Sequence, residues 1–356
     1  LAGLAKLVNS QTSTFAGKTI ILARDMDLED NAWTPIGGYA NGVVKAFSGT
    51  FDGQGHRIII KNGEVKASES SFGVFGCLSK ATVRNLTLQG RARVDYTDQS
   101  ARFIMSYAGS LAGYATSTKI EKCSSQLDMD IKLTNEAGTA SVNAGGLVGW
   151  SVGTSYESCN NIAPLKVNVT GKGTTLCYVG GITGFQNSGS SNLKATIEEC
   201  YNTGNVAGSA VNSTGGSSTC YAGGLIGNLN GSYLDMINCY NAGNATADAT
   251  ASKTGALAAS ASGTSASTSL YFNNYYLDNG LSDPTPDSEK RTGTQMRLID
   301  FVRELGDGYA LNNNGGYPIL AWEKSVDHIK VSTLPEKTEY NDLSDFDDTG
   351  MKLTVY

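Results

Sequence analysis

Apolar and polar residues alternate along many short segments of this chain. Residues 127–133 read Leu-Asp-Met-Asp-Ile-Lys-Leu, and residues 165–170 read Leu-Lys-Val-Asn-Val-Thr. A period of two is typical of a β-strand that buries one face and exposes the other. The segments between these stretches lack helical periodicity, and their many Gly, Asn and β-branched residues disfavour helices. The pattern predicts a chain built mainly of short strands.

Glycine-rich blocks divide the chain into repeats. The last residues of six successive blocks are 37, 36, 35, 43 and 32 positions apart. Insertions rich in Gly, Ser and Asn, at 186–192 and 209–219, account for the longer spacing and are expected to form outward loops. The blocks are Phe72–Gly76, Ala108–Gly113, Ala144–Gly149, Val179–Gly184, Ala222–Gly227 and Thr254–Ala259.

A second series of short strands follows the glycine blocks at the same interval. Together with the alternating stretches, it gives three strands per repeat of about 36 residues. This arrangement predicts one coil of a parallel β-helix, in which strands of successive coils stack about 4.8 Å apart. We therefore expect an all-β fold, a right-handed single-stranded parallel β-helix over residues 1–293. The second series comprises Val83–Leu86, Ile120–Cys123, Tyr156–Cys159, Ile197–Cys200, Met236–Cys239 and Asn273–Tyr275.

One repeat position holds mostly cysteine, and the residue after it is often tyrosine. A position that accepts Leu, Cys or Tyr is typical of buried packing, where a free thiol behaves as a small hydrophobe. In-register neighbours on parallel strands are also too far apart for a favourable disulfide, so we expect reduced thiols. The predicted interior ladder is Leu86, Cys123, Cys159, Cys200, Cys239 and Tyr275. The predicted outward row, and the candidate binding surface, is Tyr201, Tyr240 and Tyr276.

The glycine blocks closely resemble the GLUG motif of bacterial surface proteins, including regions of immunoglobulin A-cleaving peptidases. The repeats of this kind cover about residues 70–280, and segments such as Trp33–Gly37 and Phe47–Ile58 resemble the portion that precedes them. The resemblance implies a parallel β-helix and a secreted or cell-surface location. It implies no particular activity, because one fold serves many functions.

The C-terminal part of the chain departs from the repeat. Met296, Ile299, Val302 and Leu305 follow a three-residue spacing that predicts a short amphipathic helix. We interpret residues 294–325 as a cap that covers the last coil, as solenoid ends require. Residues 326–356 resemble the opening strands of a bacterial immunoglobulin-like domain, and are too few for a complete one.

Composition and charge limit the classes of partner that this chain is expected to bind. The chain has 356 residues, 43 of them glycine, and a net charge of −6. An acidic surface disfavours nucleic acid and anionic membranes, and no apolar run is long enough to span a bilayer. The chain begins at Leu1 with no signal peptide, so we expect a mature or trimmed form of a secreted protein.

Catalytic and metal-binding patterns are weak. His56 and His328 are the two histidines, and no HExxH, Ser-His-Asp or phosphate-loop pattern includes them. We therefore predict no catalytic residue, no metal ligand and no cofactor. The acidic pairs Asp25/Asp27, Asp128/Asp130 and Glu198/Glu199 are expected on solvated faces, with a calcium site as the alternative.

These patterns favour a non-enzymatic, adhesin-like surface protein. We expect a monomer that binds glycans or host surface proteins by displaying side chains on a rigid rod. Two alternatives stay open: a structural spacer of a larger surface peptidase, and a polysaccharide lyase or glycoside hydrolase. A groove holding two nearby carboxylates, or a carboxylate beside a basic residue, would favour the enzyme.

Overall fold

The computed structural model describes residues 1–29, 33–40, 43–64, 71–99, 103–262, 267–324, 329–333 and 352–355. It confirms the predicted fold class: parallel sheets form a β-solenoid of about six coils. Neighbouring coils pair in register, so that Tyr107, Asn143, Tyr178 and Tyr221 occupy one column across four strands. The alternating segments 127–133 and 165–170 also form strands that pair in register, with Met129 opposite Leu165.

The largest sheet forms one long face of the solenoid. Two long strands, β9 (Thr82–Asp98) and β12 (Lys119–Asn135), run the whole width of this face, and later coils divide it into shorter strands. The shorter strands are β1 (Thr19–Ile21), β2 (Met26–Asp27), β5 (Thr50–Asp52), β6 (Arg57–Glu64), β15 (Ser155–Glu157), β16 (Asn160–Asn161), β17 (Leu165–Gly171), β20 (Ala195–Glu198), β21 (Tyr201–Asn202), β22 (Val206–Asn212), β25 (Leu234–Ile237), β26 (Tyr240–Asn241), β27 (Ala245–Asp248), β30 (Tyr271–Phe272), β31 (Asn274–Leu277) and β32 (Ser288–Arg291).

Two six-stranded parallel sheets complete each coil, one before and one after the glycine block. The sheet before the block contains β7 (Ser71–Phe72), β10 (Ile104–Gly109), β13 (Ala140–Gly145), β18 (Thr175–Gly180), β23 (Ser218–Gly223) and β28 (Ala251–Gly255). The sheet after it contains β8 (Phe75–Ser79), β11 (Ala112–Thr116), β14 (Val148–Val152), β19 (Thr183–Asn187), β24 (Ile226–Asn230) and β29 (Ala261–Ser262).

The remaining elements lie at the ends and in loops. Helix α1 (Ala2–Asn9) packs Ala5 and Val8 into the core at the N-terminal end. The C-terminal segment holds η2 (Gln295–Arg297), α2 (Ile299–Leu305), β33 (Tyr309–Ala310), β34 (Ile319–Leu320) and η3 (Ala321–Glu323). Other short elements are β3 (Gly38–Ala40), β4 (Val43–Lys45), η1 (Ser191–Leu193), β35 (Ile329–Thr333) and β36 (Lys352–Val355).

The predicted immunoglobulin-like segment, 326–356, lies largely outside the described residues. Its described parts, β35 and β36, pair antiparallel. The resemblance to an immunoglobulin-like domain therefore stays a prediction.

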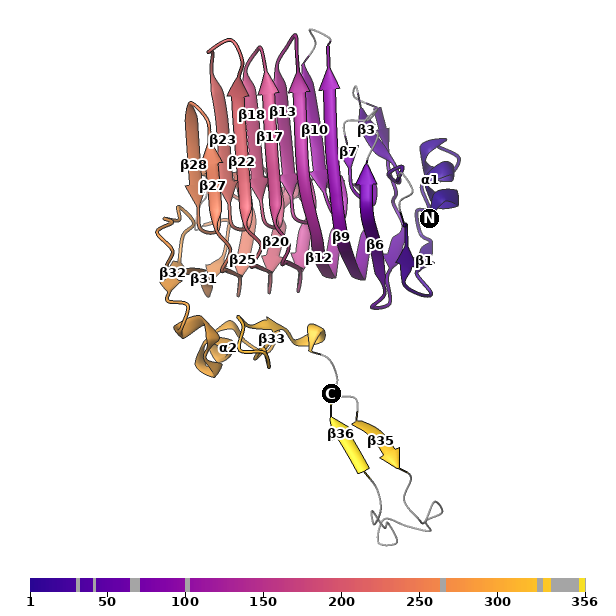
Figure 1. The fold of residues 1–356 in the computed structure, drawn as a ribbon, viewed down its shortest axis with the longest axis vertical. Coiled ribbons are helices and arrows are strands. Elements are labelled where there is room, and N and C mark those ends of the chain that lie inside the picture. The colour runs from indigo at the N-terminus through magenta and orange to yellow at the C-terminus, as the bar shows by residue number, and fades with distance from the viewer. Residues whose placement is uncertain are drawn as a thin grey trace.

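The solenoid contains two hydrophobic cores. In one, strands such as β17 and β22 pack face to face against β13, β18 and β23, and they bury Val142, Val167 and Val179. Figure 1 shows these two layers joined by loops at one edge of the molecule. The other core lies beyond the glycine blocks and buries Leu147 and Ile182.

The glycine blocks form a bend between the two cores, and in three coils this bend contains two successive glycines. A Cβ atom on Gly180 would lie 2.1 Å from the carbonyl oxygen of Thr183 in the same turn. A Cβ atom on Gly181 would lie 2.1 Å from the carbonyl oxygen of Gly224 in the next coil. Real Cβ atoms do not approach oxygen so closely, so in this coil the bend requires glycine at both positions. The first glycine recurs in all six blocks, whereas the second position is glycine in three blocks and Val74, Ser110 and Ala256 in the others.

An asparagine ladder lines the inner side of the bend. Asn161 donates from Nδ2 to Oδ1 of Asn202, and Asn202 donates to Asn241 in the same way, each at 2.8 Å. All three side chains are buried, and their amide groups also bond carbonyl oxygens of the following turn. The ladder satisfies polar groups that burial would otherwise penalise. The ladder requires glycine at position 181, because a Cβ atom there would lie 2.5 Å from Cγ of Asn202.

The cysteines of the predicted ladder are buried in the second core. Cys123 pairs in register with Leu86, and Cys159, Cys200 and Cys239 continue the series. Each of these four thiols lies 3.2–3.3 Å from the carbonyl oxygen two residues before it. A small apolar residue with a weak S–H donor fits such a corner. All seven cysteines of the chain are free thiols.

Tyr275 does not belong to this ladder. It pairs with Tyr240, so that Asn274, whose Oδ1 accepts a bond from the Cys239 amide, stands opposite Cys239. Our alignment of the last coil was wrong by one residue, and such a slip moves a strand residue to the opposite face.

Substituting Gly181 with alanine tests the close contact at the bend. Because the new Cβ atom would meet backbone in the next coil, we expect the free energy of unfolding to fall by about 2–3 kcal/mol. The matched control is Gly3→Ala in α1, where a Cβ atom meets nothing within 4 Å. Urea denaturation should separate the two variants, and equal midpoints would contradict the role of the bend.

Thiol labelling tests the burial of the cysteine column. Burial raises the pKa of the Cys239 thiol in this column, and of the Cys77 thiol outside it, to about 12, and the reactive species is the thiolate. We expect no reaction of the folded protein with Ellman's reagent at neutral pH, and full reaction in guanidinium chloride. Rapid labelling of any cysteine in the folded protein would show that this region is open.

Candidate functional site

The predicted tyrosine row is not an exposed surface. Tyr201 and Tyr240 stack as parallel rings, with centroids 5.0 Å apart, but they are only 2% and 0% exposed. The third member of this row is Tyr275, because Tyr276 pairs with Asn241 and packs against the second core. The expectation of an exposed binding row of Tyr201, Tyr240 and Tyr276 is therefore wrong.

The C-terminal cap covers this row. Phe301 from α2 packs edge-on against Tyr240 and Tyr275, and Tyr309 from β33 packs against Tyr201 and Tyr240. The cap lies along the side of several coils, where we had predicted that it covers the last one. Sequence reasoning could not foresee the contact, since exposed and covered tyrosines follow the same pattern.

Hydrogen bonds fix the cap to the solenoid. The Tyr201 hydroxyl donates to Glu323 Oε2 at 3.0 Å, and the Tyr240 hydroxyl donates to the carbonyl oxygen of Pro318. The Trp322 indole donates to the carbonyl oxygen of Ser158 at 2.9 Å. Burial raises the pKa of Glu323, and hydrogen bonds from the Leu320 amide and Tyr201 oppose this shift.

Two of the three predicted acidic pairs, Asp25/Asp27 and Asp128/Asp130, are matched by basic side chains. Asp25 contacts His56 and Arg57, with His56 Nδ1 at 3.2 Å from Asp25 Oδ1. The other aspartates pair across coils as Lys61–Asp27, Arg91–Asp128 and Arg93–Asp130. These ion pairs hold the four aspartates, whereas Glu199 of the third pair accepts a hydrogen bond from the Ser158 hydroxyl at 2.6 Å. Within the described residues, no cluster of three or more His, Cys, Asp or Glu side chains is arranged to hold a metal ion.

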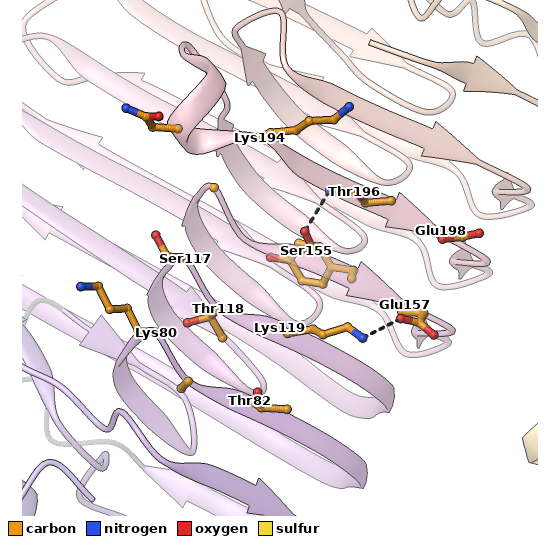
Figure 2. Close-up of a pocket in the computed structure, with 14 residues that line it drawn as sticks. Lys80, Thr82, Ser117, Thr118, Lys119, Ser155, Glu157, Lys194, Thr196 and Glu198 are labelled. Atoms are coloured by element: carbon orange, nitrogen blue, oxygen red, sulfur yellow. Dashed lines mark hydrogen bonds and ion pairs between the residues drawn. The ribbon is translucent and has the colours of Figure 1, made fainter. Parts of the chain in front are cut away.

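A cleft of about 580 Å³ lies at the corner where the sheet that follows the glycine blocks turns into the largest sheet. Figure 2 shows its lining, which comes from consecutive coils. Hydroxyl groups dominate the middle, and ammonium and carboxylate groups flank them. The labelled lining residues are Lys80, Thr82, Ser117, Thr118, Lys119, Ser155, Glu157, Lys194, Thr196 and Glu198.

Charge is unevenly compensated within the cleft. Lys119 forms ion pairs with Glu121 and with Glu157, the latter at 2.9 Å, and these contacts raise its pKa. Lys194 pairs with Asp235 at 2.9 Å. Among the described residues, no ion-pair partner contacts the ammonium group of Lys80.

Glu157 and Glu198 stand side by side on neighbouring strands. They are register partners in β15 and β20, so their backbones lie about 4.8 Å apart. Burial raises the pKa of Glu198, and the negative charges of Glu199, Glu157 and Asp235 raise it further. The cleft thus offers a polar ligand both positively charged hydrogen-bond donors, the lysine ammonium groups, and negatively charged acceptors, the glutamate carboxylates.

Sequence reasoning missed the cleft, apart from Glu198 within an acidic pair. A signal was present in the short turns that join the two strand series: Lys80–Thr82, Ser117–Lys119 and Gly153–Ser155 occupy matching places in three repeats. Each turn looks like an ordinary polar loop by itself. Only stacking of the coils makes them one surface.

One comparison with a solved structure supports the fold. No protein-family model matches this chain, and no curated protein sequence is significantly similar to it. Its structure resembles that of a Bacteroides ovatus protein described as a candidate immunoglobulin A1 protease, with 17% identity, a TM-score of 0.52, and coverage of 89% of this chain and 90% of that one. At this identity the likeness supports a shared fold. Since no family model matches, the resemblance to GLUG proteins stays a prediction.

A second solved structure, named IgA1 Protease, is 19% identical with a TM-score of 0.43. The match covers 82% of this chain and 20% of that protein. Among the described residues, no helix is both long and apolar enough to cross a membrane.

The docking of the cap should depend on pH through Glu323. Because burial raises its pKa above the usual 4.5, the docked cap favours the protonated form. Its contribution to docking is complete below pH 4.5 and is lost as the pH rises through the raised value. We expect acrylamide quenching of Trp322 fluorescence to increase with pH over this range.

Two variants make this measurement specific. Glu323→Gln keeps a neutral side chain, so its quenching should not change with pH. Trp322→Phe provides the background from Trp33 and Trp150. Equal pH profiles for the wild-type protein and Glu323→Gln would contradict the role of this carboxyl group.

Proposed function

We propose that this chain is a non-enzymatic, secreted or cell-surface bacterial protein whose solenoid binds glycans. The observation that carries the proposal is the cleft, in which stacked coils align hydroxyl, ammonium and carboxylate groups along one surface. Such a surface matches the many hydroxyl groups of a sugar chain. An adhesin-like role, with glycans or host surface proteins as partners, follows from this hypothesis.

The charges of the cleft favour an acidic sugar. Lys80 has no ion-pair partner within the described residues and can bind a carboxylate or sulfate group. Glu157 and Glu198 can accept hydrogen bonds from sugar hydroxyls, and Thr196 and Ser155 can supply further polar contacts. A repeat of this lining over successive coils suits an extended chain.

The geometry supports binding more than cleavage. Glycoside hydrolysis requires two carboxyl groups that flank the scissile bond. Glu157 and Glu198 instead extend from adjacent strands on one wall, and Glu157 is held by Lys119. A carboxylate beside a lysine is also an arrangement that would favour an enzyme, so the binding experiment includes an assay for cleavage.

A second candidate function is that of a structural spacer in a surface peptidase. The observation that favours it is the fold similarity to the Bacteroides ovatus protein, which extends over 89% of this chain. In that case the solenoid would position a catalytic domain, and its cleft would have no ligand.

A glycan array tests the proposal with three proteins. We expect the wild-type protein to bind acidic glycans and Lys80→Ala to bind them about tenfold more weakly, because a charge-assisted contact is lost. Lys172→Ala, which changes an exposed lysine outside the cleft, is the control and should bind as the wild type does.

Each outcome has a defined meaning. Absence of glycan binding by the wild-type protein would contradict the proposal and favour the spacer. Release of reducing ends or unsaturated sugars from a bound polysaccharide would show an enzyme.

A further inference from the structure

An uninterrupted strip of aromatic side chains lies on the outer side of the glycine bend. Neighbouring ring centroids along the strip are 5.1–5.9 Å apart. Most of its rings are half-buried, and Lys253 lies over the last ring at 5.1 Å. We call it the aromatic strip, and its members are Tyr107, Tyr114, Trp150, Tyr178, Phe185 and Tyr221.

The bend itself creates the strip. Tyr178 and Phe185 precede and follow the block Val179–Gly184, and the sharp turn brings their rings to 5.8 Å. The glycines between them contribute no side chain, so the rings from the two sheets meet over bare backbone. Such rings present flat apolar faces and edges to a ligand at little entropic cost.

Two polar atoms in the middle of the strip are unsatisfied. Within the described residues, neither the indole Nε1 of Trp150 nor Oδ1 of Asn143 has a hydrogen-bond partner, and both atoms are buried. Asn143 is 3% exposed and shares the register column of Tyr107 and Tyr178. The indoles of Trp33 and Trp322, in contrast, bond carbonyl oxygens at 3.1 and 2.9 Å.

The chemistry of this pair points to a hydroxyl group. The indole can only donate, and Oδ1 can only accept. A hydroxyl group can accept a hydrogen bond from an indole N–H and can donate one to an amide oxygen. A polyhydroxylated chain combines such groups with apolar C–H faces that pack on aromatic rings, whereas a purely apolar ligand would leave both atoms unpaired.

The strip is continuous with the cleft. Trp150 lies in β14, and Gly153, three residues further on, lines the cleft. At the rise of an extended strand, this separation is about 10 Å. Between them the outward side chains are Val152 and, in the next coil, Asn187, and both are partly exposed. One ligand chain can therefore contact both surfaces.

We infer that the aromatic strip is a stacking subsite for the same glycan that occupies the cleft. The inference rests on the proposed function and specifies it further: the ligand is an oligosaccharide or polysaccharide chain, not a single sugar. The acidic group binds at the cleft, and the neighbouring sugars extend over β14 and β19 to Trp150 and Phe185.

Titration with oligosaccharides of increasing length, taken from a polysaccharide that binds in the array, tests this inference by calorimetry. We expect affinity to rise with length as the chain reaches the strip. Phe185→Leu and Trp150→Phe should lower the affinity of the longest oligosaccharides about tenfold and leave that of the disaccharide unchanged. Lys80→Ala should weaken all lengths equally.

Tryptophan emission gives a second readout. Long oligosaccharides should change the emission of the wild-type protein and of Trp33→Phe, but not that of Trp150→Phe. The conservative substitutions keep apolar volume in the bend, and their melting temperatures verify folding.

The outcomes separate the two proposals. If no oligosaccharide binds the wild-type protein, the proposed function and this inference both fail. If oligosaccharides bind and Lys80→Ala weakens them, but the Phe185 and Trp150 variants match the wild type at every length, only the inference is overturned.

Discussion

The close approach of backbone to backbone at the glycine bend is the constraint on which this structure depends. Gly180 and Gly181 meet carbonyl oxygens at distances that exclude any Cβ atom. The bend separates two cores, holds the asparagine ladder on its inner side and brings aromatic rings together on its outer side. The glycines at these positions are thus a packing requirement of the bend.

Stacking of the repeats builds surfaces from residues that, taken one at a time, do not indicate a binding site. Lys80, Ser117 and Gly153 belong to ordinary turns, yet in stacked coils they line one cleft. The same register aligns Tyr178 with Tyr221, and aligns Glu157 with Glu198. A solenoid therefore suits recognition of an extended ligand, because each added coil lengthens the contact surface.

Much of the fold could be predicted from the sequence, since the glycine blocks and the cysteines repeat visibly. The last coil was misaligned because Asn274 occupies the position opposite Cys239, and no spacing rule distinguishes it from Tyr275. The position at which the cap docks could not be predicted, because nothing in the repeat indicates which residues Glu323 and Phe301 will cover. The cleft and the aromatic strip depend on neighbouring coils and on the angle of the bend, which composition does not encode.

The most direct measurement is a crystal structure of the protein with a bound oligosaccharide. The account predicts sugar density that begins beside Lys80 and continues over the outer side of β14 and β19 to Phe185. Density on another face, or an empty cleft and strip under conditions where the oligosaccharide binds in solution, would contradict it.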